Sequence, residues 1–216
     1  MKNAMLRMAM AMALGLLATP SFGGVIITSV QTGEAAPTLD SSFGQLDMAL
    51  NLGNGGALIR NGISFSNVNV TSGTGSITFV TTPLLTTGST TTNWNQANLG
   101  GGDALFYTEA YTGTNAALSV TVSGLKPGAY YQFQLLHGDP RALLYNNGLI
   151  AATDSLGNTS NANLTFGNPG PNFALVTAKV WNSTSFTYSM PTAGRGPSVA
   201  GLTVFETPEP TTLCLV

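Results

Sequence analysis

The residues whose side chains could do chemistry gather in one short stretch, His-Gly-Asp-Pro-Arg at residues 137–141. His137 is the single histidine of the chain. Asp139 and Arg141 are spaced to form a bidentate ion pair, and Arg141 alone could hold a hydroxyl or carboxylate of a ligand. We therefore predict His137, Asp139 and Arg141 as ligand-binding residues. The alternatives are a structural ion pair and a histidine satisfied at the end of a strand.

Aromatic side chains add a second candidate feature. Trp94 lies in a stretch rich in Asn and Gly, where an exposed indole could stack on the apolar face of a sugar ring. Tyr107 follows closely and is predicted to join the same binding surface. A loop anchor tucked into the core is the alternative for Trp94. Trp181 ends an apolar segment and is predicted to belong to the core.

The sequence offers little for catalysis. It contains no G-x-S-x-G elbow and no phosphate-binding loop, and a triad would have to use His137 and Asp139 without an activated serine. Glycoside hydrolysis needs two carboxyl groups about 5–10 Å apart, and Glu109 with Asp139 is the best such pair. We predict a non-enzymatic protein, with a secreted polysaccharide hydrolase using a carboxylate pair as the alternative.

Composition narrows the possible ligands. The single cysteine, Cys214, and the single histidine exclude a disulfide framework and a zinc site built from several of these residues. Calcium at Asp103 or Asp154 stays open, although no D-x-D-x-D-G spacing supports it. The seven cations are scattered, so no nucleic-acid partner is expected. No cofactor and no metal are predicted.

The N-terminus carries the marks of a signal peptide. Lys2 and Arg7 precede an apolar run over residues 8–18, which is shorter than the roughly 20 residues that span a bilayer. Small residues at Ser21 and Gly23 fit a signal-peptidase site. We predict a signal peptide over residues 1–23, cleaved after Gly23. A buried amphipathic helix is the alternative.

The C-terminus holds a Pro-Glu-Pro tripeptide, Pro208, Glu209 and Pro210, followed by Thr211. It resembles the PEP-CTERM sorting signal of Gram-negative bacteria. That resemblance implies recognition by an exosortase and processing for the cell surface or an extracellular matrix. The apolar helix and basic cluster of such signals do not follow within the printed chain. Residues 207–216 are therefore predicted to be a truncated signal, with membrane association only if the native chain continues. A chance Pro-rich tail is the alternative.

The middle of the chain alternates with a period of two residues. In 131–137, Tyr131, Phe133 and Leu135 share one face with His137, while the glutamines point the other way. Asn61-Gly62 and Lys126-Pro127-Gly128 are turn signals. The predicted strands cover 25–30, 63–70, 76–81, 118–123, 131–137, 173–181, 185–190 and 199–205. The pattern predicts one all-β domain over residues 24–206, an antiparallel jelly-roll β-sandwich.

Two stretches read as long loops. Residues 81–102 are rich in Thr, Asn and Gly, and residues 153–172 are rich in Asn, Gly and Thr. Loops of this length are usually functional or disordered. Residues 104–111 fit either a short helix or a strand.

The middle of the chain also resembles a family of secreted β-sandwich domains that accompany PEP-CTERM signals. The residues that carry this resemblance are Asn61–Phe65 and the strand motif G-L-x-x-G-x-x-Y-x-x-Q-L within 123–141, followed by D-x-R. The resemblance implies a galactose-binding-like fold, and it implies no particular activity. We therefore expect an exported surface or matrix protein of a Gram-negative bacterium, with extracellular polysaccharide as the candidate partner.

Overall fold

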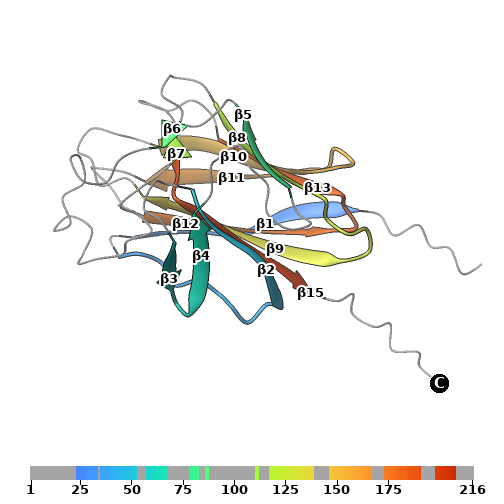
Figure 1. Ribbon diagram of the computed structural model, residues 1–216. Coiled ribbons are helices and arrows are strands. Elements are labelled where there is room, and N and C mark those ends of the chain that lie inside the picture. Colours follow the sequence, from blue (N-terminus) through green and yellow to red (C-terminus); the bar gives the residue numbers. More distant parts are fainter. Residues whose placement is uncertain are drawn as a thin grey trace, which may run out of the picture.

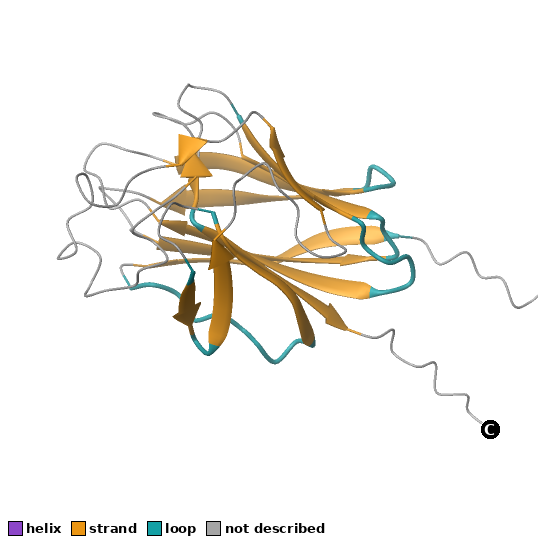
Figure 2. Cartoon of the chain, in the orientation of Figure 1, coloured by secondary structure: helices purple, strands orange, loops and turns teal. Residues whose placement is uncertain are grey.

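The computed structural model describes residues 23–33, 35–52, 57–67, 78–82, 86–87, 110–111, 117–138, 146–166, 173–190 and 198–207 (Figure 1). Within these ranges every regular element is a β-strand (Figure 2). No helix in the described part of the chain is long and apolar enough to cross a membrane.

Two sheets stacked face to face form the body of the molecule (Figure 1). The larger sheet has the order β1 (Gly24–Gly33), β12 (Phe173–Trp181), β9 (Tyr130–Gly138), β15 (Gly201–Thr207), β2 (Gln45–Asn51), β4 (Ile63–Asn67) and β3 (Leu58–Arg60). The smaller sheet has the order β11 (Thr159–Phe166), β10 (Asn146–Asp154), β13 (Ser185–Met190), β8 (Leu118–Ser123) and β5 (Thr78–Thr82). Three two-residue strands, β14 (Ser198–Val199), β7 (Ala110–Tyr111) and β6 (Thr86–Thr87), pair at one end.

The prediction of an all-β sandwich is confirmed. The strand pairs are antiparallel except for β2 and β4, which run parallel where Leu50 lies opposite Ser66. This pair departs from the all-antiparallel expectation. It arises because β3 runs antiparallel to β2 along the chain but takes the outer edge, so that β4, the second strand of the β3–β4 hairpin, lies beside β2.

The space between the sheets holds the main core. Alternation in β9 turns Tyr131, Phe133 and Leu135 inward, as predicted, and β8 and β13 supply their partners from the other sheet. Phe133 of one sheet stacks on Phe186 of the other, with ring centroids 3.9 Å apart and planes 11° from parallel. Both rings are fully buried, so this pair joins the two sheets at the centre.

A second apolar cluster covers part of the outer face of the larger sheet. Leu136, Phe173 and Leu175 lie on that face, beneath the β3–β4 hairpin and beneath residues 35–44. We call residues 35–44 the strap. The outer face is therefore divided into a region covered by the hairpin and strap and a region at the other end of β9 and β12, which we call the open region because no other described strand lies over it.

Turn chemistry follows the sequence signals. Asn61 and Gly62 both have positive φ (50° and 76°) in the tight β3–β4 hairpin, as a type I′ turn requires. Pro127 and Gly128 occupy the centre of the β8–β9 turn, where Ala129 N donates to the Lys126 carbonyl and Gly128 has φ 85°. This is the type II arrangement, with Pro first and Gly second.

Three expectations about elements need correction. The predicted loop at 153–172 contains β11, whose inward positions are the small Ala162 and the buried Leu164. The strands β2 and β10 were not predicted, and β6 lies inside the stretch read as the loop 81–102. Trp181 is half-buried on the outer face rather than in the core, because Ala178 and Val180 take the inward positions of β12.

Candidate functional site

Of the five predicted binding residues, the structure describes His137 alone. His137 is fully buried, and its Nε2 lies 3.2 Å from the hydroxyl of Tyr188 on the opposite sheet. Burial raises the pKa of Tyr188 well above its usual value, so the hydroxyl stays protonated. This arrangement agrees with the alternative of a histidine that is satisfied at the end of a strand. Several other residues singled out in the sequence lie outside the described residues: Trp94, Asp103, Tyr107, Glu109, Asp139, Arg141 and the tripeptide Pro208, Glu209 and Pro210.

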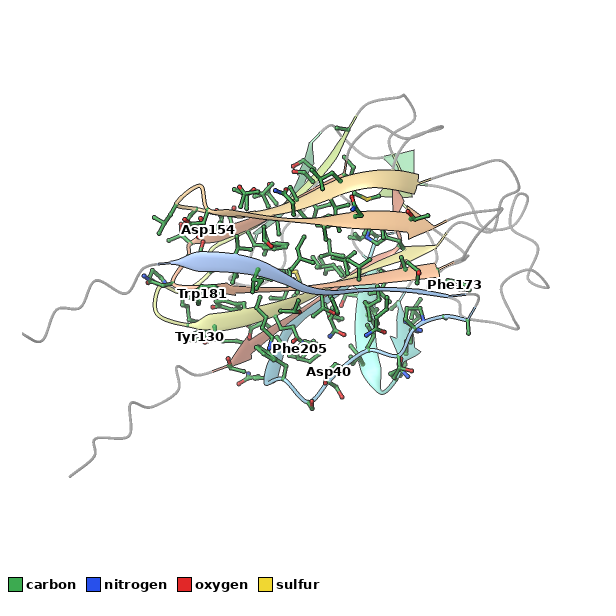
Figure 3. All side chains as sticks on the ribbon, turned by 180° about the vertical axis from the view of Figure 1, so that it is seen from behind. Asp40, Tyr130, Asp154, Phe173, Trp181 and Phe205 are labelled. Atoms are coloured by element: carbon green, nitrogen blue, oxygen red, sulfur yellow. The ribbon has the colours of Figure 1, made fainter. Side chains whose placement is uncertain are left out.

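The open region of the outer face carries a pair of aromatic rings instead. Tyr130 of β9 lies opposite Trp181 of β12. Trp181 also lies opposite Gly24 of β1, and Tyr130 lies opposite Thr207 of β15. These four residues therefore form one row across the sheet. Figure 3 shows the two aromatic side chains side by side at one end of the sandwich.

The indole of Trp181 lies flat on the sheet because its neighbour is a glycine. A Cβ atom added to Gly24 would fall 2.1 Å from Cζ2 of the indole and 2.5 Å from Cε2. The indole therefore covers the Gly24 backbone directly. The phenol ring of Tyr130 is only 17° from parallel to it, with centroids 6.4 Å apart. Both side chains are half-buried, and we call this pair of nearly parallel rings the platform.

The next row along the strands adds polar groups to the platform. Lys179 lies opposite Gln132, with Ile26 on one side and Phe205 on the other. Side chains two residues apart on one strand face are about 7 Å apart, so this row borders the platform directly. The Lys179 ammonium lies 4.7 Å from the ring centroid of Phe43 in the strap, a cation–π contact.

The strap is held in place by a buried glutamine. Gln134 accepts a hydrogen bond from Asp40 N at 2.8 Å and donates one to the Asp40 carbonyl at 2.8 Å, and its Nε2 also lies 3.2 Å from Thr203 Oγ1. The side-chain amide thus pairs with the strap backbone as a neighbouring strand would. Arg60 donates to the Pro37 carbonyl and fixes the strap at a second point.

Asp40 stands at the edge of this region, close to the row of Lys179 (Figure 3). Its carboxylate accepts hydrogen bonds from the Ser42 hydroxyl at 2.6 Å and from Ser42 N at 2.9 Å. These bonds lower the pKa of Asp40, with smaller contributions from the Gln132 amide and the Lys179 ammonium. The carboxylate is therefore ionised at neutral pH, and its Oδ1 already accepts two hydrogen bonds from Ser42.

A second polar cluster was not found from the sequence. Lys126 Nζ lies 2.7 Å from Glu206 Oε2, and the Tyr131 hydroxyl donates to the same oxygen at 3.4 Å. A β-bulge omits Asp47 from the pairing of β2 with β15, which turns its carboxyl toward Glu206. Burial and Glu206 raise the pKa of Asp47, whereas Lys126 lowers the pKa of Glu206.

These two carboxyl groups lie close enough to shift each other's pKa, and Glu206 is held in its ion pair with Lys126. We interpret the cluster as a contact that closes the end of the sandwich. The bulge that creates it has no signature in the residue pattern.

Asp154 also has a structural role. Its Oδ1 accepts hydrogen bonds from Leu156 N and Asn158 N, both at 2.9 Å, and its Oδ2 accepts one from Asn158 Nδ2 at 2.7 Å. The carboxylate therefore organises the β10–β11 turn. Within the described ranges no group of three His, Cys, Asp or Glu side chains is placed to hold a metal ion.

Comparisons with known proteins give only remote similarities. No protein-family model matches the chain, and no curated protein matches it. Among solved structures, the chain is similar to the ANXUR1 extracellular domain from Arabidopsis thaliana, at 12% identity and a TM-score of 0.45. The match covers 82% of this chain and 53% of that one, so the chain spans about half the length of that domain.

Two further similarities are weaker still. The enzymatically active domain of bacteriophage CBA120 tailspike protein 4 is 18% identical, with 67% of this chain and 23% of that chain covered and a TM-score of 0.31. TmCBM61, solved in complex with β-1,4-galactotriose, is 11% identical, with 61% and 83% covered and a TM-score of 0.21. These similarities therefore give no information about which residues of this chain bind a ligand.

Proposed function

We propose that this protein is an exported, non-enzymatic β-sandwich protein that binds carbohydrate on the outer face of its larger sheet. The observation that carries the proposal is the platform. Trp181 and Tyr130 present two partly exposed rings on the outer face of the sheet, with their planes 17° from parallel. The axial C–H face of a pyranose ring is apolar and packs well on such a surface.

The surroundings of the platform suit a sugar. Hydroxyl groups need hydrogen-bonding partners at the edge of the stacked ring, and a few placed polar groups are enough to give orientation. Lys179 and the strap supply such groups beside the rings. The chain as a whole is low in charge, at 7%, which agrees with recognition by stacking and hydrogen bonds.

Replacing Trp181 with alanine tests this proposal. We expect the full-length wild-type chain to bind oligosaccharides on a glycan array, and Trp181→Ala to lose at least tenfold in affinity, since about 1.4 kcal/mol of stacking corresponds to tenfold. Trp181→Phe keeps a flat ring and should retain most of the binding. Gly24→Ala keeps both rings but removes the space under the indole, so it should also weaken binding.

Trp94→Ala is the matched comparison, because Trp94 is the other tryptophan of the chain. Circular dichroism should show that every variant stays folded. If Trp181→Ala still binds glycans and Trp94→Ala does not, the binding site lies in the Asn/Gly-rich stretch around Trp94 and the platform is not the site. If the wild-type chain binds no glycan on the array, the proposal of carbohydrate binding is wrong, and a structural role in an extracellular matrix is the function that remains.

The proposal includes export and surface sorting. Its support is the signal-peptide pattern before Gly23 and the Pro208-Glu209-Pro210 tripeptide. The first strand begins at Gly24, so removal of residues 1–23 leaves the sandwich intact. Signal peptidase, and then an exosortase of a Gram-negative host, are the proposed processing partners.

Intact mass of the protein recovered outside the cytoplasm tests export. We expect a mature chain that begins at Gly24 or within a few residues of it. Gly23 is packed against Leu156, and its carbonyl accepts a hydrogen bond from Asn158. Cleavage should therefore precede docking of β1. A cellular protein that keeps Met1 would contradict this part of the proposal.

A further inference from the structure

We propose that Lys179 makes the platform selective for acidic sugars, in which a uronic-acid carboxylate lies against the ammonium group. This inference rests on the proposed carbohydrate function and specifies its ligand class. It concerns the row next to the platform, where the half-buried Lys179 lies opposite the buried Gln132.

The position of Lys179 fits a substituent of a stacked sugar. Lys179 and Trp181 lie two residues apart on the same face of β12, so their Cα atoms are about 7 Å apart. A pyranose ring stacked on the indole therefore directs one edge toward the lysine. The carboxylate of a uronic acid projects from the ring edge, and it would meet the ammonium there.

The other described cations are engaged differently. Lys126 forms an ion pair with Glu206 at 2.7 Å, and Arg60 is buried and donates to the Pro37 carbonyl. Among the residues that the structure describes, no carboxylate forms an ion pair with Lys179. Its contact is the Phe43 ring, 4.7 Å from Nζ. A cation–π contact holds the ammonium in place without neutralising its charge.

The nearest carboxylate leaves the ammonium open to a ligand. Asp40 directs its Oδ1 to the hydroxyl and the backbone N–H of Ser42, and it stays beyond ion-pair distance of Lys179. A half-buried, positioned ammonium forms charge-assisted hydrogen bonds that are stronger than neutral ones. Lys179 attracts Asp40 without forming an ion pair with it, so its ammonium can still bind a ligand carboxylate, and the platform beside it sets the ring position.

Matched acidic and neutral oligosaccharides test the selectivity. The probes are oligomers of galacturonic, glucuronic or mannuronic acid, each beside its carboxyl-reduced counterpart with the same linkage. We expect the full-length chain to prefer at least one acidic oligomer over its reduced form by tenfold or more, and added salt should weaken this preference. Calorimetric titration of each pair gives the two affinities.

Three lysine variants test whether Lys179 causes the preference for acidic oligomers. Lys179→Met should bind the acidic and the reduced oligomers equally well, whereas Lys179→Arg should keep the preference. Lys126→Met removes a cation from the other polar cluster and should leave the preference unchanged. Equal binding of both forms by the wild-type chain, or a preference that survives Lys179→Met, would overturn the assignment of Lys179.

The same titrations separate this inference from the proposed function. Neutral and acidic forms that both bind equally, and both lose affinity in Trp181→Ala, would refute the role of Lys179 while supporting the platform. Acidic oligomers that bind Trp181→Ala as tightly as the wild-type chain would refute the platform itself.

Discussion

Replacing Phe186 with alanine is expected to lower the free energy of unfolding by about 3–5 kcal/mol. Phe186 is fully buried and stacks on Phe133 of the opposite sheet, with centroids 3.9 Å apart. The substitution removes the ring that stacks on Phe133 across the two sheets and leaves a cavity between them. Chemical denaturation followed by circular dichroism measures the loss.

Leu149→Ala is the matched control for this substitution. Leu149 lies in the same sheet, but 58% of its surface is exposed. An exposed substitution of this kind changes stability by roughly 0.5 kcal/mol or less. Similar losses for Phe186→Ala and Leu149→Ala would contradict the packing of the two sheets through the Phe133–Phe186 pair.

Gln134→Leu is expected to cost about 2–4 kcal/mol and to loosen the strap. The buried amide of Gln134 pairs with both the N–H and the carbonyl of Asp40. Leucine has a similar size but leaves these partly buried backbone groups without partners, at about 1–3 kcal/mol each. Hydrogen exchange should show the Asp40 amide exchanging much faster in the variant, and denaturation should show the loss of stability.

Gln132→Leu provides the contrast on the same strand and the same face. Gln132 is 3% exposed, and its Nε2 has no hydrogen-bond partner among the described residues, although the amide lies near enough to Asp40 to lower the pKa of that carboxyl. Its replacement removes a desolvated donor, so we expect a change within about 0.5 kcal/mol or a small gain. A large loss for Gln132→Leu, with little effect of Gln134→Leu, would show that the strap is held elsewhere.

The sequence predicted the fold well because its strands are amphipathic. In β9 the inward aromatic and aliphatic residues alternate with glutamines, and the Asn61-Gly62 and Pro127-Gly128 turns have the backbone angles that these residues favour. The strand β11 escaped detection for a related reason. Its outward positions, Asn161 and Asn163, are typical of turns, and its inward Ala162 gives a weak apolar signal.

The candidate site was much harder to predict. Period-two alternation gives the face of a residue but not its partner on the next strand. Trp181 became part of a platform because Gly24, far away in the chain, lies under its indole. The alternation of β12 does place Trp181 and Lys179 on the same face. Had that face been assigned to the outside of the sheet, the sequence would have indicated both residues as candidates for a binding surface. The glutamines of β9 were expected to face away from the core, but the strap that buries Gln134 could not be inferred from their pattern.

The row formed by Gly24, Trp181, Tyr130 and Thr207 also governs how the protein can be attached to a support. The first strand begins and the last strand ends on this row, so any tether joined before Gly24 or after Thr207 is fixed beside the platform. A tether at either end would hold the two rings close to whatever surface it connects to. For a sensor chip, coupling near Gly33 at the far end of β1 would instead direct the rings toward the solution. If the rings bind carbohydrate as proposed, the same geometry on an anchored protein would favour glycans that lie near the anchoring surface over those presented by a distant neighbour.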